Sequence, residues 1–328
     1  MPTDVTGVHG GDGLIRARAR RRALCDRWHE MSPIVGPPVF ACPVCGEPLP
    51  PAADSFVCAN GHSFDVAREG YVNLLLAQYR RSKDPGYSKD MIAGRRDFFD
   101  AGHYAPLADG IAEQIQAVLP PGPDRVVVDA GCGEGYYLRR LRLMLNRESA
   151  TPADAVQGVT LCGMDISKHG IRVAARRDPD GLYAVAGTYR MPVLENRVDA
   201  LLTHFSPVSA EDFRRVVRPG GVVLVGGPGE GHLFSFKELL YDTAATHEPE
   251  ATLARESGFE LIDTHVIRYP LKLRGPGQVA NLLLMTPFFW SVDDDARARL
   301  AALDALDTEV DVVVHAYRRT ETTPDKGP

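Results

Sequence analysis

Three cysteines and a histidine near the N-terminal end have the spacing of a metal site. Cys42 and Cys45 are separated by two residues, and after twelve more residues Cys58 and His62 form a C-x3-H pair. Thiolates and an imidazole at these intervals can close a tetrahedral zinc site in which each pair supplies two ligands. Because four protein ligands leave no open coordination position, we predict a structural zinc that folds a segment too short to build its own core.

A second candidate site is the glycine-rich run DAGCGEG at residues 129–135, which follows a short apolar segment. Glycines at a strand-to-helix junction, such as Gly131 and Gly133, let the backbone turn tightly and approach a ligand. The third glycine comes too early for a dinucleotide fingerprint, and the acid Asp129 suits an ammonium group better than a pyrophosphate. Asp165, at the end of the next predicted strand, is placed to accept hydrogen bonds from two ribose hydroxyls.

An ammonium, a ribose and no phosphate together describe S-adenosylmethionine. The run therefore predicts a methyl-donor site, with a dinucleotide site or a degenerate nucleotide-binding domain as the alternative.

The composition limits the class of protein. With 328 residues, 44% hydrophobic and 24% charged, the chain is close to globular averages, which excludes collagen, low-complexity disorder and a small disulfide scaffold. No apolar run approaches the ~20 residues of a membrane-spanning helix. No signal-peptide core follows the N-terminal arginines, and the six cysteines are too few for a disulfide framework, which favours a reducing, cytoplasmic location.

The charge is unevenly distributed along the chain. Residues 14–96 carry 13 Lys and Arg against 8 Asp and Glu, whereas residues 97–328 carry 24 against 33. Such a distribution suits a nucleic-acid-facing module attached to an acidic catalytic body, although scattered basic residues can equally form a solvated face. For phosphate contact we favour Arg80, Arg81 and Lys83, which lie in a polar stretch after the cysteine and histidine segment.

Strands alternate with helices through most of the chain. Apolar spacing predicts two helices within 91–119, broken near Gly102 and Pro106, and further helices at 136–145 and 167–177. Strands are predicted at 125–129, 159–165, 183–186, 200–204, 222–226, 260–269 and 310–317. This order predicts a parallel, doubly wound, Rossmann-like α/β sheet. The expected division is a flexible extension at 1–38, a zinc-binding module at 39–76, a basic linker and helices at 77–122, a methyltransferase domain at 123–319 and a tail at 320–328.

With both motifs in place, the chain resembles the RlmA family of 23S rRNA (guanine-N1)-methyltransferases, which includes macrolide-resistance members. The resemblance runs from about residue 39 to 318 and leaves out the extension before it. Besides the two motifs it includes AREGYVNLL at 67–75, RSKDPG at 81–86, DAGHY at 100–104, RPGG at 218–221, GPGEGH at 227–232 and MTPF at 285–288.

The resemblance implies a class I methyltransferase fold and a homodimer whose zinc modules and catalytic domains form an RNA-binding cleft. It implies a target guanine in a 23S rRNA hairpin near the peptide exit tunnel, where a methyl group can obstruct a macrolide. By position, Tyr104, Gly133, Glu134 and His232 match residues that contact the methyl donor, and the three cysteines and His62 match zinc ligands. Residue chemistry alone would not select Tyr104 or His232.

Methylation at guanine N1 requires an acceptor for the N1 proton and a surface that holds the extruded base. Both could lie in the segment THFSP at 203–207, which has neither the N-P-P-Y signature of exocyclic-amine methylation nor a cysteine for carbon-5 chemistry. Phe205 is the candidate stacking residue and His204 a candidate base, with a satisfied strand-end histidine as the alternative. The segment departs from the family pattern, so no catalytic role is carried over.

Two other functions remain open from the sequence: a small-molecule methyltransferase, and a non-enzymatic zinc-dependent RNA-binding protein with a vestigial donor site. The 31 arginines against 6 lysines fit a GC-rich genome of the kind antibiotic producers have, a hint toward a resistance role.

Overall fold

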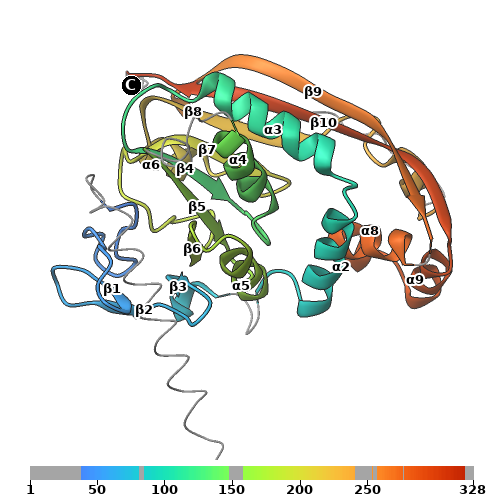
Figure 1. Cartoon of the computed structure of the whole chain (residues 1–328), viewed down its shortest axis with the longest axis horizontal. Coiled ribbons are helices and arrows are strands. Elements are labelled where there is room, and N and C mark those ends of the chain that lie inside the picture. Colours follow the sequence, from blue (N-terminus) through green and yellow to red (C-terminus); the bar gives the residue numbers. More distant parts are fainter. Residues whose placement is uncertain are drawn as a thin grey trace, which may run out of the picture.

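An eight-stranded sheet in the order β3-β6-β5-β4-β7-β8-β10-β9 forms the centre of the protein (Figure 1). The computed structural model describes residues 38–80, 85–147, 158–240, 253, 257–275 and 277–321. The predicted extension at 1–38 therefore lies outside the described residues except for Pro38, as do Arg81, Lys83 and most of the predicted tail.

The elements have the following bounds. The strands are β1 Ser55–Val57, β2 Ser63–Asp65, β3 Tyr71–Asn73, β4 Arg125–Ala130, β5 Val159–Asp165, β6 Leu182–Val185, β7 Val198–His204, β8 Val217–Pro228, β9 Phe259–Arg274 and β10 Ala305–Arg319. The helices are α2 Lys89–Asp100, α3 Ala105–Val118, α4 Tyr136–Arg147, α5 Lys168–Arg177, α6 Ala210–Val216, α7 Phe234–Glu238, α8 Gln278–Met285 and α9 Asp294–Ala301, with 3-10 turns η1 Ala77–Tyr79 and η3 Pro287–Trp290.

The central strands run parallel, as the apolar runs predict. β4 pairs with β5 on one side and with β7 on the other, so Asp129 lies opposite Gly163 and Leu202. From β4 the chain proceeds through β5 to β6 in one direction across the sheet, whereas β7 and β8 extend it in the other. Such a reversal opens a crevice at the carboxyl ends of the two flanking strands, here β4 and β7.

The predicted parallel sheet is confirmed for its central strands, but one strand near its far edge, β10, runs in the opposite direction. β10 pairs antiparallel with both β8 and β9, so the sheet is mixed. In β9, exposed and buried residues are interspersed along most of the length of the strand. A strand with one solvated face is typical of antiparallel pairing, whereas interior parallel strands such as β7 are buried along their whole length.

Two layers cover the sheet. One face packs against α3, α4 and α5, through side chains such as Ile111, Leu138 and Ile171. The opposite face packs against α6 and the cysteine and histidine segment, through Phe213 and Phe40. In Figure 1 the strands β1 and β2 of that segment lie at the end of the sheet away from α8 and α9.

The cysteine and histidine segment is continuous with the main sheet. Its last strand, β3, pairs in parallel with β6, with Tyr71 opposite Tyr183. A backbone bridge also joins Phe40 to Val193. The segment thus has no separate core, in agreement with the expectation that it is too short to build one, and it forms one edge of the eight-stranded sheet.

The two helices predicted within 91–119 are α2 and α3. Ser88 caps α2 by accepting a hydrogen bond from Met91 N at 3.3 Å, and Gly102, with a φ of +82°, lies between the helices. A Cβ at Gly94 of α2 would lie 2.8 Å from Leu284 of α8, so the two helices pack closely at this point. Among the described helices, none is long and apolar enough to cross a membrane.

Candidate methyl-donor site and zinc centre

The four predicted zinc ligands converge at one point. The ligand atoms of Cys42, Cys45, Cys58 and His62 all lie within 4.8 Å of one another. Cys45 Sγ is 3.8 Å from Cys58 Sγ, and Cys58 Sγ is 3.4 Å from His62 Nδ1. A tetrahedral ion with Zn–S bonds of about 2.3 Å separates two sulfurs by about 3.8 Å, so this set fits zinc.

Local backbone structure explains why the ligands converge. Each ligand pair lies on a tight turn that contains a glycine with positive φ, Gly46 and Gly61, both at +79°. Gly46 N donates to Cys42 O at 2.8 Å, and Gly61 N donates to Cys58 O at 2.9 Å. The second turn joins β1 to β2, and Val57 N of β1 donates to Pro50 O at 3.1 Å, which holds the chain that follows the first turn against this hairpin. Hydrogen bonds from the Asn60 side chain and the backbone of Glu47 lower the pKa of Cys45 to about 6, which favours the thiolate that zinc requires.

The glycine run forms the turn between β4 and α4, at the crevice described above. Gly131, Gly133 and Gly135 have φ values of +97°, +56° and +78°, which side chains other than glycine rarely adopt. A Cβ at Gly131 would collide with the side chain of Ser206, which follows β7. The loops after β4 and β7 are therefore in direct contact, and the run could not carry a side chain at that position.

Asp165 holds the glycine run in place. Its Oδ2 accepts a hydrogen bond from Gly133 N at 2.9 Å, and its Oδ1 accepts one from Ser167 N at 2.7 Å. Each carboxylate oxygen can accept a further hydrogen bond, so the predicted contact with ribose hydroxyls fits this arrangement.

Asp129 lies beneath the run, almost fully buried, and its Oδ2 has no hydrogen-bond partner among the described residues. Burial, with a smaller contribution from the charge of Asp165, raises the pKa of Asp129 to about 8, although Arg95 opposes the shift. A buried carboxylate without a partner is unfavourable. An ammonium group would satisfy it, so the residues present fit the amino-acid head of S-adenosylmethionine.

The other residues matched by the resemblance have different surroundings. Tyr104 is 3% exposed, with its ring centroid 5.2 Å from that of Phe98. Glu134 Oε2 accepts a hydrogen bond from Arg177 Nη1 at 3.1 Å, whereas the buried Oε1 has no partner among the described residues. His232 Nδ1 accepts from Asp311 N at 3.2 Å.

Phe205 and His204, the two candidates at the end of β7, differ in exposure. Phe205 is 40% exposed, has a φ of +52° and lies with its ring 5.4 Å from that of His232. A non-glycine residue in this conformation is strained, and such strain is concentrated at functional sites. His204 is 4% exposed and stacks on Tyr137 at 5.3 Å, and neither ring nitrogen has a partner among the described residues. Burial lowers the pKa of His204 to about 4.

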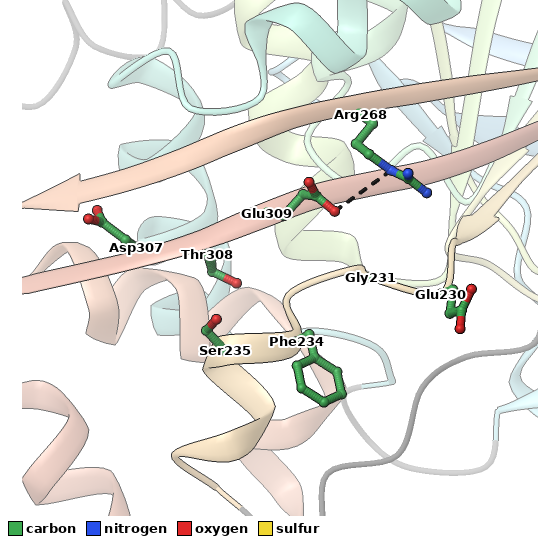
Figure 2. A pocket seen from close by; sticks show the side chains of 8 residues that line it. All are labelled: Glu230, Gly231, Phe234, Ser235, Arg268, Asp307, Thr308 and Glu309. Atoms are coloured by element: carbon green, nitrogen blue, oxygen red, sulfur yellow. Dashed lines mark ion pairs between the residues drawn. The ribbon is translucent and has the colours of Figure 1, made fainter.

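An open pocket of about 660 Å³ lies between the start of α7 and the strands β9 and β10 (Figure 2). Figure 2 shows Glu309 of β10 directed at Arg268 of β9, with 3.7 Å between the carboxylate and the guanidinium, and Glu230 on the loop after β8. Carboxylates in this pocket can accept hydrogen bonds from N–H groups, the donors that guanine carries at N1 and N2.

Of the predicted phosphate contacts, Arg80 is described and is exposed. It lines a second pocket, of about 370 Å³, together with Lys168, His169 and Arg172 of α5. The sequence analysis missed the α5 residues because their position beside Arg80 depends on the pairing of β3 with β6. It also missed Ser206 and Arg177, for which the sequence has no local signal.

Comparison with known proteins gives the family. The model of the RlmA N-terminal zinc ribbon matches residues 40–83. A 23S rRNA (guanine(748)-N(1))-methyltransferase of Streptomyces fradiae is 33% identical over 80% of this chain and 89% of its own length. Relatives from Micromonospora griseorubida and Bacillus subtilis, which bear the same family name, are 35% and 30% identical and are covered over 98% and 95% of their lengths. The chain belongs to the 23S rRNA (guanine-N1)-methyltransferase family.

Membership of the guanine-N1 methyltransferase family confirms the resemblance and the α/β fold with an N-terminal zinc module. It also agrees with the two cofactors predicted from the residues. The zinc would be held by the Cys42, Cys45, Cys58 and His62 set, and S-adenosylmethionine by the crevice between β4 and β7.

Proposed function

We propose that this protein transfers the methyl group of S-adenosylmethionine to N1 of a guanine in 23S rRNA. The observation that carries the proposal is the buried Asp129 oxygen without a described partner, beneath a glycine run fixed by Asp165, in a member of this family. When bound, S-adenosylmethionine supplies an activated methyl group. The residues of the chain must then align the guanine with it, exclude water and allow the N1 proton to leave.

Each side chain of the crevice has a role in this reaction. Asp129 binds the ammonium group and Asp165 the ribose, while Gly131, Gly133 and the backbone at Glu134 allow close approach. Phe205, exposed next to His232, stacks on the extruded guanine, because aromatic rings hold unpaired bases by stacking. In this proposal the target base lies against the exposed ring of Phe205.

The N1–methyl bond forms as the methyl–sulfur bond of the donor breaks and S-adenosylhomocysteine leaves, and the proton on N1 passes to a base or to water. His204 is neutral near pH 7 because burial lowers its pKa to about 4. Its imidazole has a nitrogen that can take a proton, but so low a pKa makes it a weak base. Water is the alternative acceptor.

Arg80 and the basic residues of the neighbouring pocket bind phosphates of the RNA. We further propose that the enzyme acts in the cytoplasm as a homodimer and that its target lies in a hairpin near the peptide exit tunnel. Methylation there would obstruct macrolides and confer resistance. The name of the Streptomyces fradiae relative specifies guanine 748 of 23S rRNA and supports only the choice of a single guanine as the target.

The test uses purified full-length protein, methyl-labelled S-adenosylmethionine and unmodified 23S rRNA, followed by digestion to nucleosides and mass spectrometry. Labelled 1-methylguanosine is the expected product, and mapping its position tests the exit-tunnel assignment. At a donor concentration below saturation, the variant Asp129→Asn should lower the yield of this product, whereas Arg96→Ala, on the exposed side of α2, should not. A protein that binds the donor but methylates neither naked RNA nor ribosomal particles would contradict the proposal.

A further inference from the structure

Arg95 of α2 lies over the glycine run. Its Nε and Cζ are 3.7 and 3.9 Å from the position that a Cβ on Gly133 would occupy. The guanidinium is flanked by two aromatic rings, with its carbon 5.3 Å from the centroid of Tyr87 and 5.4 Å from that of Phe99. The rings and the packing of α2 on α8 fix the side chain at the edge of the crevice.

Arg95 forms no ion pair with any carboxylate among the described residues, in contrast to its neighbour. Arg96 is exposed and pairs with Asp97 at 2.8 Å. Arg95 is half-buried, donates a hydrogen bond to the Tyr87 side chain and is attracted by the charge of Asp165, but no ion pair among the described residues replaces its lost hydration. An anionic ligand would therefore be favoured at this position.

The charge of Arg95 acts on the whole candidate donor site. It opposes the upward pKa shifts of Asp129, Asp165 and Glu134, and it lowers the pKa of Tyr104 relative to burial alone. Asp129 and Arg95 are thus opposite charges beside the same glycine run. Together they form a complementary pair for a zwitterion that carries both an ammonium and a carboxylate.

We propose that Arg95 binds the carboxylate of the methionine portion of S-adenosylmethionine. This inference rests on the proposed function and deepens it by assigning the second charge of the amino-acid head. A guanidinium can hold a carboxylate through two parallel hydrogen bonds, which makes it selective for that group. The crevice then distinguishes the methyl donor from adenine nucleosides that lack the carboxylate. The helix α2, which carries Arg95, forms part of the wall of the donor site.

The test compares two ligands by isothermal titration calorimetry, S-adenosylmethionine and decarboxylated S-adenosylmethionine, which lacks only the carboxylate. The wild-type protein should prefer the intact donor by roughly 10-fold to 100-fold, the range for charge-assisted hydrogen bonds. Arg95→Ala should weaken binding of the intact donor by a similar factor and leave the decarboxylated ligand nearly unchanged, so the preference disappears. Arg95→Lys should retain part of it, and Arg96→Ala all of it.

Several outcomes would overturn the assignment. A wild-type protein that binds both ligands equally has no carboxylate site, whatever the variants do. If Arg95→Ala weakens both ligands by the same factor, the side chain shapes the pocket and does not bind the carboxylate. If the wild type binds neither ligand, both the assignment of the donor site and this inference are wrong. If the ligand preference is intact but the protein does not methylate RNA, only the proposed function is contradicted.

Discussion

The zinc centre and the methyl-donor crevice differ in where their polar groups come from and in how those groups are satisfied. At the zinc centre, four ligands from one stretch of 21 residues, Cys42 to His62, already lie at distances that a single ion requires. In the crevice, the groups come from α2, β4, β5 and β7, and Asp129 is buried with an oxygen that no described residue satisfies. The first arrangement stabilises the fold, whereas the second is unfavourable until a ligand binds.

The largest expected effect comes from removing the zinc. Cys58→Ala, or treatment with a strong chelator, should unfold the segment around the β1–β2 hairpin and release β3 from β6. Binding of structural zinc contributes on the order of 10 kcal/mol or more, which exceeds what this small segment could recover otherwise. Zinc content and limited proteolysis of residues 40–80 would report the loss.

Val44→Ala is the control for this experiment, because Val44 is 54% exposed between two ligands and contributes little to packing. Resistance of the metal-free protein to proteolysis in this region would mean that packing alone folds the segment.

The second prediction concerns the role of Asp129 in binding the donor. Asp129→Asn keeps the shape but removes the negative charge, so binding of S-adenosylmethionine should weaken by roughly 10-fold to 100-fold, as for the loss of one charged hydrogen bond. Calorimetry would measure the change, with Arg96→Ala as the matched control. Unchanged affinity would show that the ammonium group binds elsewhere.

The third prediction concerns stability and pH at the same residue. The pKa of Asp129 is about 8 in the folded protein, against an ordinary value of 3.8. At a pH between these two values, the Asp129 carboxyl is protonated in the folded state and ionised in the unfolded state. Stability in the donor-free protein therefore falls as pH rises toward 8. Asp129→Asn removes this penalty, and its Tm should exceed that of the wild type by several degrees at pH 8.5 and by little at pH 4.5.

A Tm difference that does not grow with pH would contradict this account. Donor affinity should rise between pH 6 and 8, as Asp129 ionises, and fall above about pH 8, as the donor's own amino group loses its proton.

The fourth prediction separates base stacking from donor binding. Phe205→Ala should lower kcat/KM for RNA by about 10-fold, since stacking on an aromatic ring contributes roughly 1–3 kcal/mol per base. Affinity for S-adenosylmethionine should stay the same. Phe205→Trp, which preserves stacking, should recover activity; if it does not, the exposed ring has another role.

The smallest expected effect lies at the basic pocket. Arg80→Ala combined with Lys168→Ala should reduce the slope of log affinity for RNA against log salt by about 1.5, or about 0.7–0.9 for each lost phosphate contact. Binding of S-adenosylmethionine should be unaffected. An unchanged slope would place the RNA elsewhere on the molecule, and weaker donor binding would assign the pocket to the donor.

Features that depend on residues close together in the chain could be predicted from the sequence. The zinc ligands and the glycine run depend on short turns, whose residue types and spacing are sufficient to place them. The parallel strands are also predictable, because continuous apolar runs such as 126–128 are typical of interior strands. The fold class and the family resemblance followed from these features.

Features that depend on contacts between distant segments could not be predicted. The short strand β3 has no signal of its own and is defined by its pairing with β6, more than 100 residues away. The reversed direction of β10, which pairs antiparallel with β8 and β9, was missed because it depends on the connection from β9 through α8 and α9.

The sequence by itself determined that this protein has a zinc site and a methyl-donor loop, because both consist of residues close together in the chain. Only the tertiary structure decided which charges face that loop. Arg95 and Arg96 are adjacent and chemically identical, yet one lies over Gly133 and the other in solvent. The packing of α2 against α8 sets the rotation of the helix, and therefore which of the two arginines reaches the crevice.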